Sequence, residues 1–256
     1  KWTINTYNIN YNLNSGTWNG SSPSKTYTIN DCEKPLPSPI RTGYIFEGWK
    51  SASGDYISKL PTSSYLDDLS LTASWIEGTE GLTFITRHSG TIYVIVTGYT
   101  GNSANVVVPK TYRGIPVECI SASAFRNQTQ ISSISLPDSL TSIESNAFAG
   151  CTGLTSIVIP DKVTSVDSTA FSGCTNITTV SMPASIRNYI PNVKNATITS
   201  GNAIQASAFE NCTTLLSVTL PNSLVSIGNK AFYGCSNLNS LNIPSNVTLI
   251  GANAFY

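Results

Sequence analysis

The string IESNAFAGCTGLTSIVIP, from Ile143 to Pro160, decides the fold, because close variants of it return along most of the last two-thirds of the chain. One phenylalanine marks each copy: Phe125, Phe148, Phe171, Phe209, Phe232 and Phe255. The steps between them are 23 residues long, except that the step from Phe171 to Phe209 is 38. A fixed period in the twenties is typical of a solenoid, whose units bury their apolar faces by stacking on their neighbours.

Apolar residues recur at fixed places around each phenylalanine. A branched aliphatic residue stands five places before it and an alanine directly before it. Further apolar residues follow six, nine and eleven places after it, which in the quoted copy are Leu154, Ile157 and Ile159. The last two alternate as on a strand, and a proline follows them, so we predict one short parallel strand per 23-residue repeat.

Glycine or asparagine follows two places after the phenylalanine in the first five copies: Asn127, Gly150, Gly173, Asn211 and Gly234. Both residue types tolerate a positive φ, so we predict a tight turn there. Each repeat then consists of a strand, a turn and a compact second limb that carries the Ala-Phe pair inward. Stacked repeats give a mainly β, curved solenoid with a spine of phenylalanines.

The repeat resembles the BspA-type leucine-rich repeat, with its pattern I-x-x-x-AF-x-GC-x-x-L-x-x-I-x-IP, over residues 82–256. The resemblance implies a right-handed solenoid in a secreted or surface-attached bacterial protein. It also implies binding of host or microbial partners, and it assigns no catalytic role to the repeat positions.

Residues 1–76 do not carry the repeat and are predicted to form a separate β domain. Alternating apolar residues predict a first strand at 7–13 and a last strand at 69–75. Between them lies the string KPLPSPIRTGYIFEGW, in which Tyr44 and Phe46 share a strand face.

This pattern resembles the internalin-type B repeat over residues 5–76. The resemblance implies a small β-grasp-like domain that acts as a spacer or adhesion module. An unrelated small β domain is the alternative.

The remaining boundaries follow from the repeat register. We place a linker at 77–81, an N-terminal cap with a β-hairpin at 82–119, and the repeats at 120–256. The fifteen extra residues of the long step lie within 187–203. Insertions in solenoids emerge as loops that often make contacts, so we predict a loop there.

The composition limits the classes of partner. Charged residues make up only 11% of the chain, and fourteen acids balance fourteen bases. Nucleic acids and anionic membranes both select clustered positive charge, so neither is a predicted partner. The sequence contains no run of eighteen apolar residues, so it predicts no membrane span. The abundance of Ser, Thr and Asn favours a secreted or cell-surface protein, and the start at Lys1 leads us to expect a signal peptide or other upstream sequence.

Four of the six cysteines stand three places after a phenylalanine: Cys151, Cys174, Cys212 and Cys235. Neighbouring coils lie about 4.8 Å apart, so disulfides between them are geometrically possible. We favour buried free thiols, because a small apolar residue beside a core phenylalanine suits this position. His88 is the only histidine and no CxxC pair is present, so we predict no metal site. Cys32 and Cys119 receive no role.

No catalytic motif is present, whether GxSxG, HExxH or a phosphate-binding glycine loop. We therefore predict a non-enzymatic interaction protein that needs no cofactor and binds an extracellular protein or glycan. A structural stalk that holds another domain away from the cell is the alternative. An enzyme of glycan turnover has the least support, since the adjacent pair Asp67 and Asp68 is typical of solvated residues.

Interface energy concentrates in tryptophan, tyrosine and arginine, and this decides the candidate contacts. The residues eight and ten places after each phenylalanine are mainly Ser, Thr and Asn, which suit secondary or glycan contacts. The insertion and the variable position one place after each phenylalanine offer stronger anchors. The candidate partner-binding residues are Arg187, Tyr189, Ile190, Arg126 and Tyr233.

Overall fold

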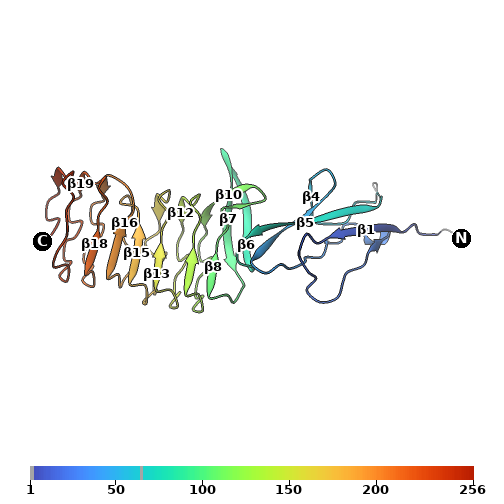
Figure 1. The fold of residues 1–256 in the computed structure, drawn as a ribbon, viewed down its shortest axis with the longest axis horizontal. Coiled ribbons are helices and arrows are strands. Elements are labelled where there is room, and N and C mark those ends of the chain that lie inside the picture. The colour runs from blue at the N-terminus through green and yellow to red at the C-terminus, as the bar shows by residue number, and fades with distance from the viewer. Residues whose placement is uncertain (1–2, 64–65) are drawn as a thin grey trace. The chain divides into compact units, whose positions relative to one another are not determined.

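The computed structural model describes residues 3–63 and 66–256 (Figure 1). The chain divides into two compact units, Lys1–Glu80 (unit 1) and Gly81–Tyr256 (unit 2). Among the described residues the only helical turn is the 3-10 turn η1, Ile29–Asp31, so the predicted mainly β architecture is confirmed.

Unit 1 is one mixed sheet with the strand order β2-β1-β5-β3-β4. The strands are β1 (Tyr7–Asn12), β2 (Thr26–Tyr27), β3 (Tyr44–Lys50), β4 (Tyr56–Ile57) and β5 (Leu69–Glu77). β1 runs parallel to β5, and the other pairs are antiparallel. The predicted first and last strands therefore lie side by side at the centre of the sheet.

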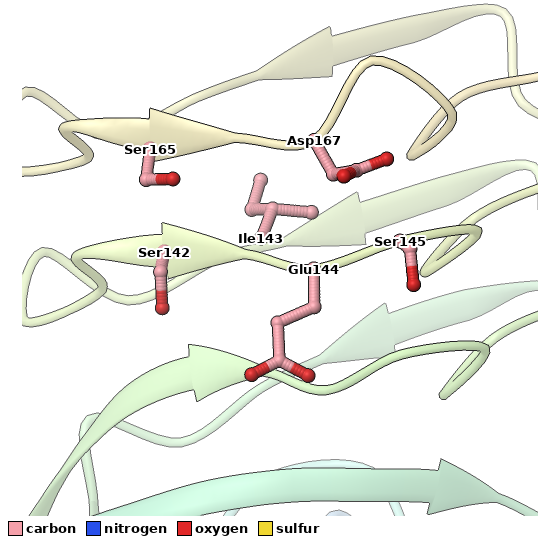
Figure 2. Close-up of a pocket in the computed structure, with 6 residues that line it drawn as sticks. All are labelled: Ser142, Ile143, Glu144, Ser145, Ser165 and Asp167. Carbon is pink, nitrogen blue, oxygen red and sulfur yellow. The ribbon is translucent and has the colours of Figure 1, made fainter.

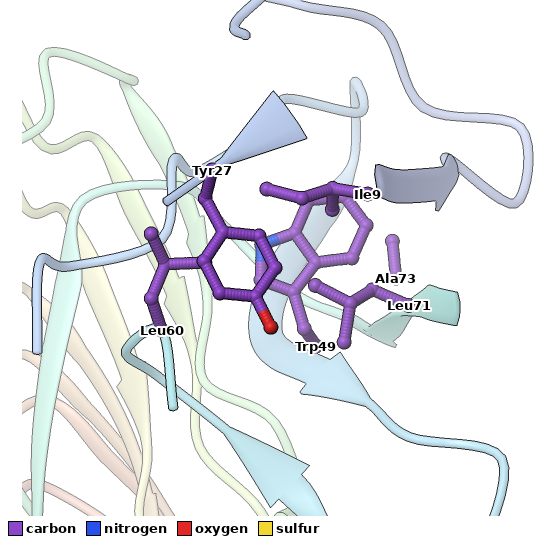
Figure 3. Packing of buried hydrophobic residues seen from close by; sticks show 6 residues of the cluster. All are labelled: Ile9, Tyr27, Trp49, Leu60, Leu71 and Ala73. Atoms are coloured by element: carbon purple, nitrogen blue, oxygen red, sulfur yellow. The ribbon is translucent and has the colours of Figure 1, made fainter. Parts of the chain in front are cut away.

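Trp49 is the centre of the unit 1 core (Figure 3). Its side chain is 1% exposed, and its indole nitrogen donates a hydrogen bond to the Pro37 carbonyl at 2.7 Å. A β-bulge lies between Phe46 and Gly48, where Gly48 has φ 135°. Because the bulge shifts the side-chain alternation by one residue, Phe46 and Trp49 meet with ring centroids 5.4 Å apart. The cluster packed around Trp49 is Ile9, Tyr27, Leu60, Leu71 and Ala73.

Unit 2 stacks its repeats as successive coils (Figure 1). The predicted strand is present in every repeat except that of Phe232, and these strands pair in parallel in two separate ladders. Residues 241–243, where the repeat pattern predicts a strand, do not form one. These strands are β8 (Asn105–Val107), β11 (Ser133–Ser135), β13 (Ser156–Val158), β15 (Thr179–Met182), β16 (Asn195–Ile198) and β18 (Ser217–Thr219).

Most coils add a second parallel strand of two residues, which the sequence pattern alone does not predict. These short strands form a second ladder in two parts. The first part is β12 (Ser142–Ile143) and β14 (Ser165–Val166), and the second part is β17 (Ala203–Ile204), β19 (Ser226–Ile227) and β20 (Leu249–Ile250). The cap begins this ladder with the hairpin β6 (Leu82–Ser89) and β7 (Thr91–Tyr99), followed by β9 (Thr111–Tyr112) and β10 (Ile115–Ile120).

The phenylalanines form the predicted spine. Phe148 stacks on Phe125 and on Phe171, with ring centroids 5.2 Å apart in each pair. Phe232 stacks in the same way on Phe209 and Phe255, at 5.4 and 5.5 Å. The predicted turns are confirmed as well, since all five Gly and Asn residues after the phenylalanines have φ between 60° and 75°.

The fifteen extra residues form a shortened coil rather than the predicted loop. Strand β16 is paired on both sides, with β15 and β18. The Asn188 amide donates to the Ala208 carbonyl at 2.8 Å, as the Phe148 amide donates to Ala170 at 2.8 Å, so Asn188 occupies the phenylalanine position of this coil. A loop would expose the apolar residues of the segment, whereas the coil buries them. They are Ile190, Val193, Ala196 and Ile198.

The cysteines of the repeat are free thiols that link successive coils. The Cys151 and Cys174 thiols each donate to the carbonyl of the phenylalanine one coil earlier, at 3.0 Å, and Cys235 does so at 3.1 Å. In the first repeat Gln128 stands in place of cysteine, and its amide donates to the Tyr99 carbonyl at 3.0 Å. Burial raises the pKa of the Cys151 thiol to about 12 and that of Cys235 to about 11.

We expect these thiols to be unreactive in the native protein. In a thiol titration at pH 8, Cys151 and Cys174 should stay unmodified, because the thiolate is the reactive form and its fraction is very small. Denaturant without reductant should release all six cysteines, and a lower number would reveal disulfides between coils. Since the unfolded thiols ionise near their ordinary pKa of 9.0 and the buried ones do not, unit 2 should also lose stability as the pH rises above about 9.

Candidate functional site

The position one place after each phenylalanine forms a row along one edge of unit 2, which we call the edge row. Because Asn188 occupies a phenylalanine position, Tyr189 joins this row, although the sequence register had not placed it there. The members of the edge row, in coil order, are Arg126, Ala149, Ser172, Tyr189, Glu210, Tyr233 and Tyr256.

Arg187 and Tyr189 form the first half of a polar aromatic cluster on this edge. The Arg187 guanidinium lies 5.8 Å from the centroid of the Tyr189 ring, within the range of a cation–π contact. Its Nε donates to the Ser207 carbonyl at 3.2 Å, which holds an exposed side chain to the next coil. The pair is therefore ordered before any partner arrives.

Lys230, Glu210 and Tyr233 form the second half. Lys230 Nζ lies 3.9 Å from Glu210 Oε1 and 5.3 Å from the centroid of the Tyr233 ring. Tyr233 in turn stacks on Tyr256, with centroids 5.6 Å apart and planes 14° from parallel. Two tyrosines, a cation and an anion thus meet on three successive coils. The repeat pattern does not point to Lys230, which stands two places before a phenylalanine.

Two of the predicted site residues lie outside this cluster. Ile190 is 3% exposed and packs inside the shortened coil, so it is not available to a partner, and its prediction is wrong. Arg126 is exposed, but the coils of Ala149 and Ser172 separate it from Tyr189. Three coil spacings amount to about 14 Å. The structure therefore pairs Arg187 with Tyr189, places Tyr233 two coils further along the same edge, and leaves Arg126 apart.

The strand face beside this edge carries small polar groups. Ser133 donates to Asn105 Oδ1 at 2.6 Å and Ser217 donates to Asn195 Oδ1 at 2.7 Å, so hydroxyls and amides bond along the ladder. None of the outward residues is aromatic or charged, which leaves this face without strong interface anchors. They are Asn105, Val107, Ser133, Ser135, Ser156, Val158, Thr179, Ser181, Asn195, Thr197, Ser217 and Thr219.

An open depression of about 430 Å³ lies on the second ladder, with Glu144 and Asp167 from successive coils in its lining (Figure 2). Glu144 accepts hydrogen bonds from the Ala122 amide at 2.9 Å and the Cys119 thiol at 3.5 Å. The Asp167 carboxylate accepts from the hydroxyl and amide of Thr169, which hold the pKa of Asp167 below its ordinary value. A general acid requires the opposite shift, so Asp167 is poorly suited to that role.

Comparison with protein families identifies the two units. A model described as a BspA type leucine rich repeat region matches in six copies, over residues 118–193 and 188–256, which is more than half of the chain. The protein belongs to the BspA-type leucine-rich repeat family. Proteins of this family are typically secreted or surface-associated, and their repeats are generally binding or scaffold modules. A Listeria-Bacteroides repeat domain matches residues 7–73, which confirms a bacterial repeat domain in unit 1.

Solved structures of bacterial leucine-rich repeat proteins are similar to this BspA-type protein. One, from Eubacterium ventriosum, is 26% identical with a TM-score of 0.51, over 64% of this chain and 47% of its own. Another, from T. pallidum, is 26% identical with a TM-score of 0.43, over 66% of this chain and 83% of its own. A leucine rich cell surface protein from Faecalibacterium prausnitzii is 28% identical with a TM-score of 0.43, over 69% of this chain and 50% of its own. The chain thus spans about half the length of two of these proteins.

No curated protein matches the chain. Within residues 3–63 and 66–256, no helix has the length and apolar character needed to cross a membrane. The same residues contain no group of three His, Cys, Asp or Glu side chains placed to hold a metal ion.

Proposed function

We propose that this BspA-type protein is a non-enzymatic, secreted or cell-surface protein of a bacterium that binds an extracellular protein through the edge of unit 2. The cluster of Arg187, Tyr189, Glu210, Lys230 and Tyr233 is the observation that carries the proposal. Unit 1 serves as a spacer or adhesion module next to it.

The composition of the cluster supports a protein partner. Tyrosine and arginine are the residues most enriched among interface anchors, and the strand face and the depression on the second ladder carry neither. The contacts of Arg187 with Ser207 and of Lys230 with Glu210 hold the long side chains in place before binding. Such pre-ordering reduces the entropy lost on association, which is about 0.5–1.5 kcal/mol for each immobilised side chain.

A binding screen tests the proposal directly. The protein is presented to a panel of extracellular matrix proteins and to a glycan array, and each hit is measured by surface plasmon resonance. We expect a protein hit. A glycan hit alone would move the site toward the hydroxyl-rich strand face, and the absence of any hit would favour the structural stalk.

For a protein hit, the double variant Arg187→Ala with Tyr189→Ala should weaken binding at least tenfold, which corresponds to about 1.4 kcal/mol. The reason is that it removes the cation–π pair and leaves the buried part of the shortened coil unchanged. The matched control is Ser156→Ala with Ser217→Ala on the strand face, which should leave the Kd within about twofold. The reverse ranking would place the site on the strand face.

A further inference from the structure

The cap of unit 2 ends in an open sheet edge. β6 is the outermost strand of its sheet, with β7 on one side and no strand of the described part of the chain on the other. From Ile85 to Ser89 every residue of β6 is exposed, and Ile92 of the paired strand is exposed too. An edge strand presents a row of outward amide and carbonyl groups that can pair with another extended chain.

The outer part of β6 has only one of the usual protections of an edge strand, the charged side chain of Arg87. Such edges are normally blunted by charged side chains, especially lysine, by proline or by a β-bulge. The only register shift in the β6–β7 pair lies between Thr83 and Phe84, so the ladder is regular from Phe84 to Ser89. That stretch contains neither lysine nor proline, and Ile85 and Ile92 expose 38% and 49% of their surface.

The charge on the outer part of β6 is positive, although the whole protein is neutral. Residues 82–117 contain Arg87, Lys110 and Arg113 and no aspartate or glutamate, and Lys110 is paired with Asp138 at 3.1 Å. Phe84 of β6 stacks on Tyr112, with ring centroids 4.5 Å apart, and the Arg113 guanidinium lies 5.5 Å from the centroid of the same tyrosine ring. Arg113 is therefore held beside the strand that carries Arg87 and His88.

We propose that the open edge of β6, from Phe84 to Ser89, takes up an extended, acidic segment of another protein as an added strand. Main-chain hydrogen bonds along β6 supply the affinity in this mode of recognition, and alternate side chains supply the selectivity. Acidic side chains on one face of the segment pair with Arg87, and apolar side chains on its other face cover Ile92. This surface belongs to the cap, several coils away from the cluster of Tyr189 and Tyr233, so the two proposals stand independently.

The test uses the full chain and three end-blocked synthetic peptides. The acidic probe is TVEVTVEV, the basic probe is TVKVTVKV, and the third probe is the acidic peptide N-methylated at alternate residues, which cannot pair as a strand. Amide hydrogen exchange of residues 84–89 and isothermal calorimetry are measured with each. Of the three peptides, we expect only the acidic one to slow amide exchange in β6. Added salt should weaken the binding of this peptide.

A charge reversal makes the test specific. Arg87→Glu should weaken binding of the acidic peptide at least tenfold and strengthen binding of the basic peptide. The matched reversal Lys162→Glu, at another exposed cation, should change the binding of neither peptide. Circular dichroism checks that both variants stay folded. Unchanged exchange in β6 at about 1 mM of every probe would overturn the proposal. So would equal binding of acidic and basic peptides, or protection of β6 in a dimer formed without any peptide, which would make a second copy the occupant.

Discussion

Replacing Phe148 with alanine is expected to lower the free energy of unfolding of unit 2 by about 3–5 kcal/mol, the usual effect of truncating a buried phenylalanine. Phe148 has no exposed surface and stacks on one phenylalanine in each direction, so its loss leaves a cavity in the middle of the spine. Chemical denaturation followed by far-UV circular dichroism measures the effect. A domain has about 5–15 kcal/mol of stability, so the variant should lose a large share of it.

Ser172→Ala is the control for this variant, because Ser172 belongs to the neighbouring coil and is exposed. Its midpoint of unfolding should match that of the unchanged protein. If both variants shifted the midpoint by the same small amount, the phenylalanine register would not be the source of stability.

Replacing Trp49 with alanine is expected to unfold unit 1 while unit 2 stays folded. The cluster at the core of unit 1 has six buried apolar residues, and Trp49 is the largest of them. Losing it costs about 3–5 kcal/mol, which approaches the whole stability of a domain of about 80 residues.

Tryptophan fluorescence separates the two units, because all four tryptophans lie in the first 76 residues. The fluorescence transition should disappear in Trp49→Ala, while the main transition in circular dichroism, which comes from unit 2, should stay in place. Ile4→Ala removes an apolar residue that is 57% exposed and should leave both transitions unchanged. A parallel loss of both transitions in Trp49→Ala would show that the units fold as one.

The repeat register and the turns could be predicted from sequence because each rests on a local rule. The inward face of a strand follows from alternation, and a backbone with positive φ selects glycine or asparagine, as at Gly150 and Asn211. The second ladder is harder to predict, because strands of two residues are too short to give a periodic pattern. Their pairing becomes visible only when coils stack, as for Ile143 beside Val166.

The strand half of the shortened coil has a sequence signal, although the count of residues between phenylalanines predicts a loop. Val193, Ala196 and Ile198 have the same spacing as Leu154, Ile157 and Ile159, so the strand half of a repeat is present. The repeat is recognised by its Ala-Phe pair, and this coil lacks that pair, so a register counted from phenylalanines does not include it. The same omission hid the place of Tyr189 in the edge row and led to the wrong assignment of Ile190 as a contact residue.

Lys230 could not be predicted as part of the cluster. It stands two places before a phenylalanine, where it has φ 55°, and its side chain reaches the edge row only because that backbone conformation turns it toward Glu210 and Tyr233. Most repeats have Ser or Asn at this position with the same positive φ. The sequence shows the residue type but not the direction of the side chain.

The shortened coil also divides unit 2 mechanically. In a repeat protein each coil is stabilised by itself and by its nearest neighbours, so cooperativity travels only as far as the contacts between neighbours are strong. The ring stack runs from Tyr99 to Phe171 and starts again at Phe209, with Asn188 between them. Across this gap the coils are joined by strand pairing of β15, β16 and β18 and not by stacked rings, so we expect cooperativity to be weakest there. The cluster around Tyr189 and Tyr233 lies on the shortened coil and the coils that follow it.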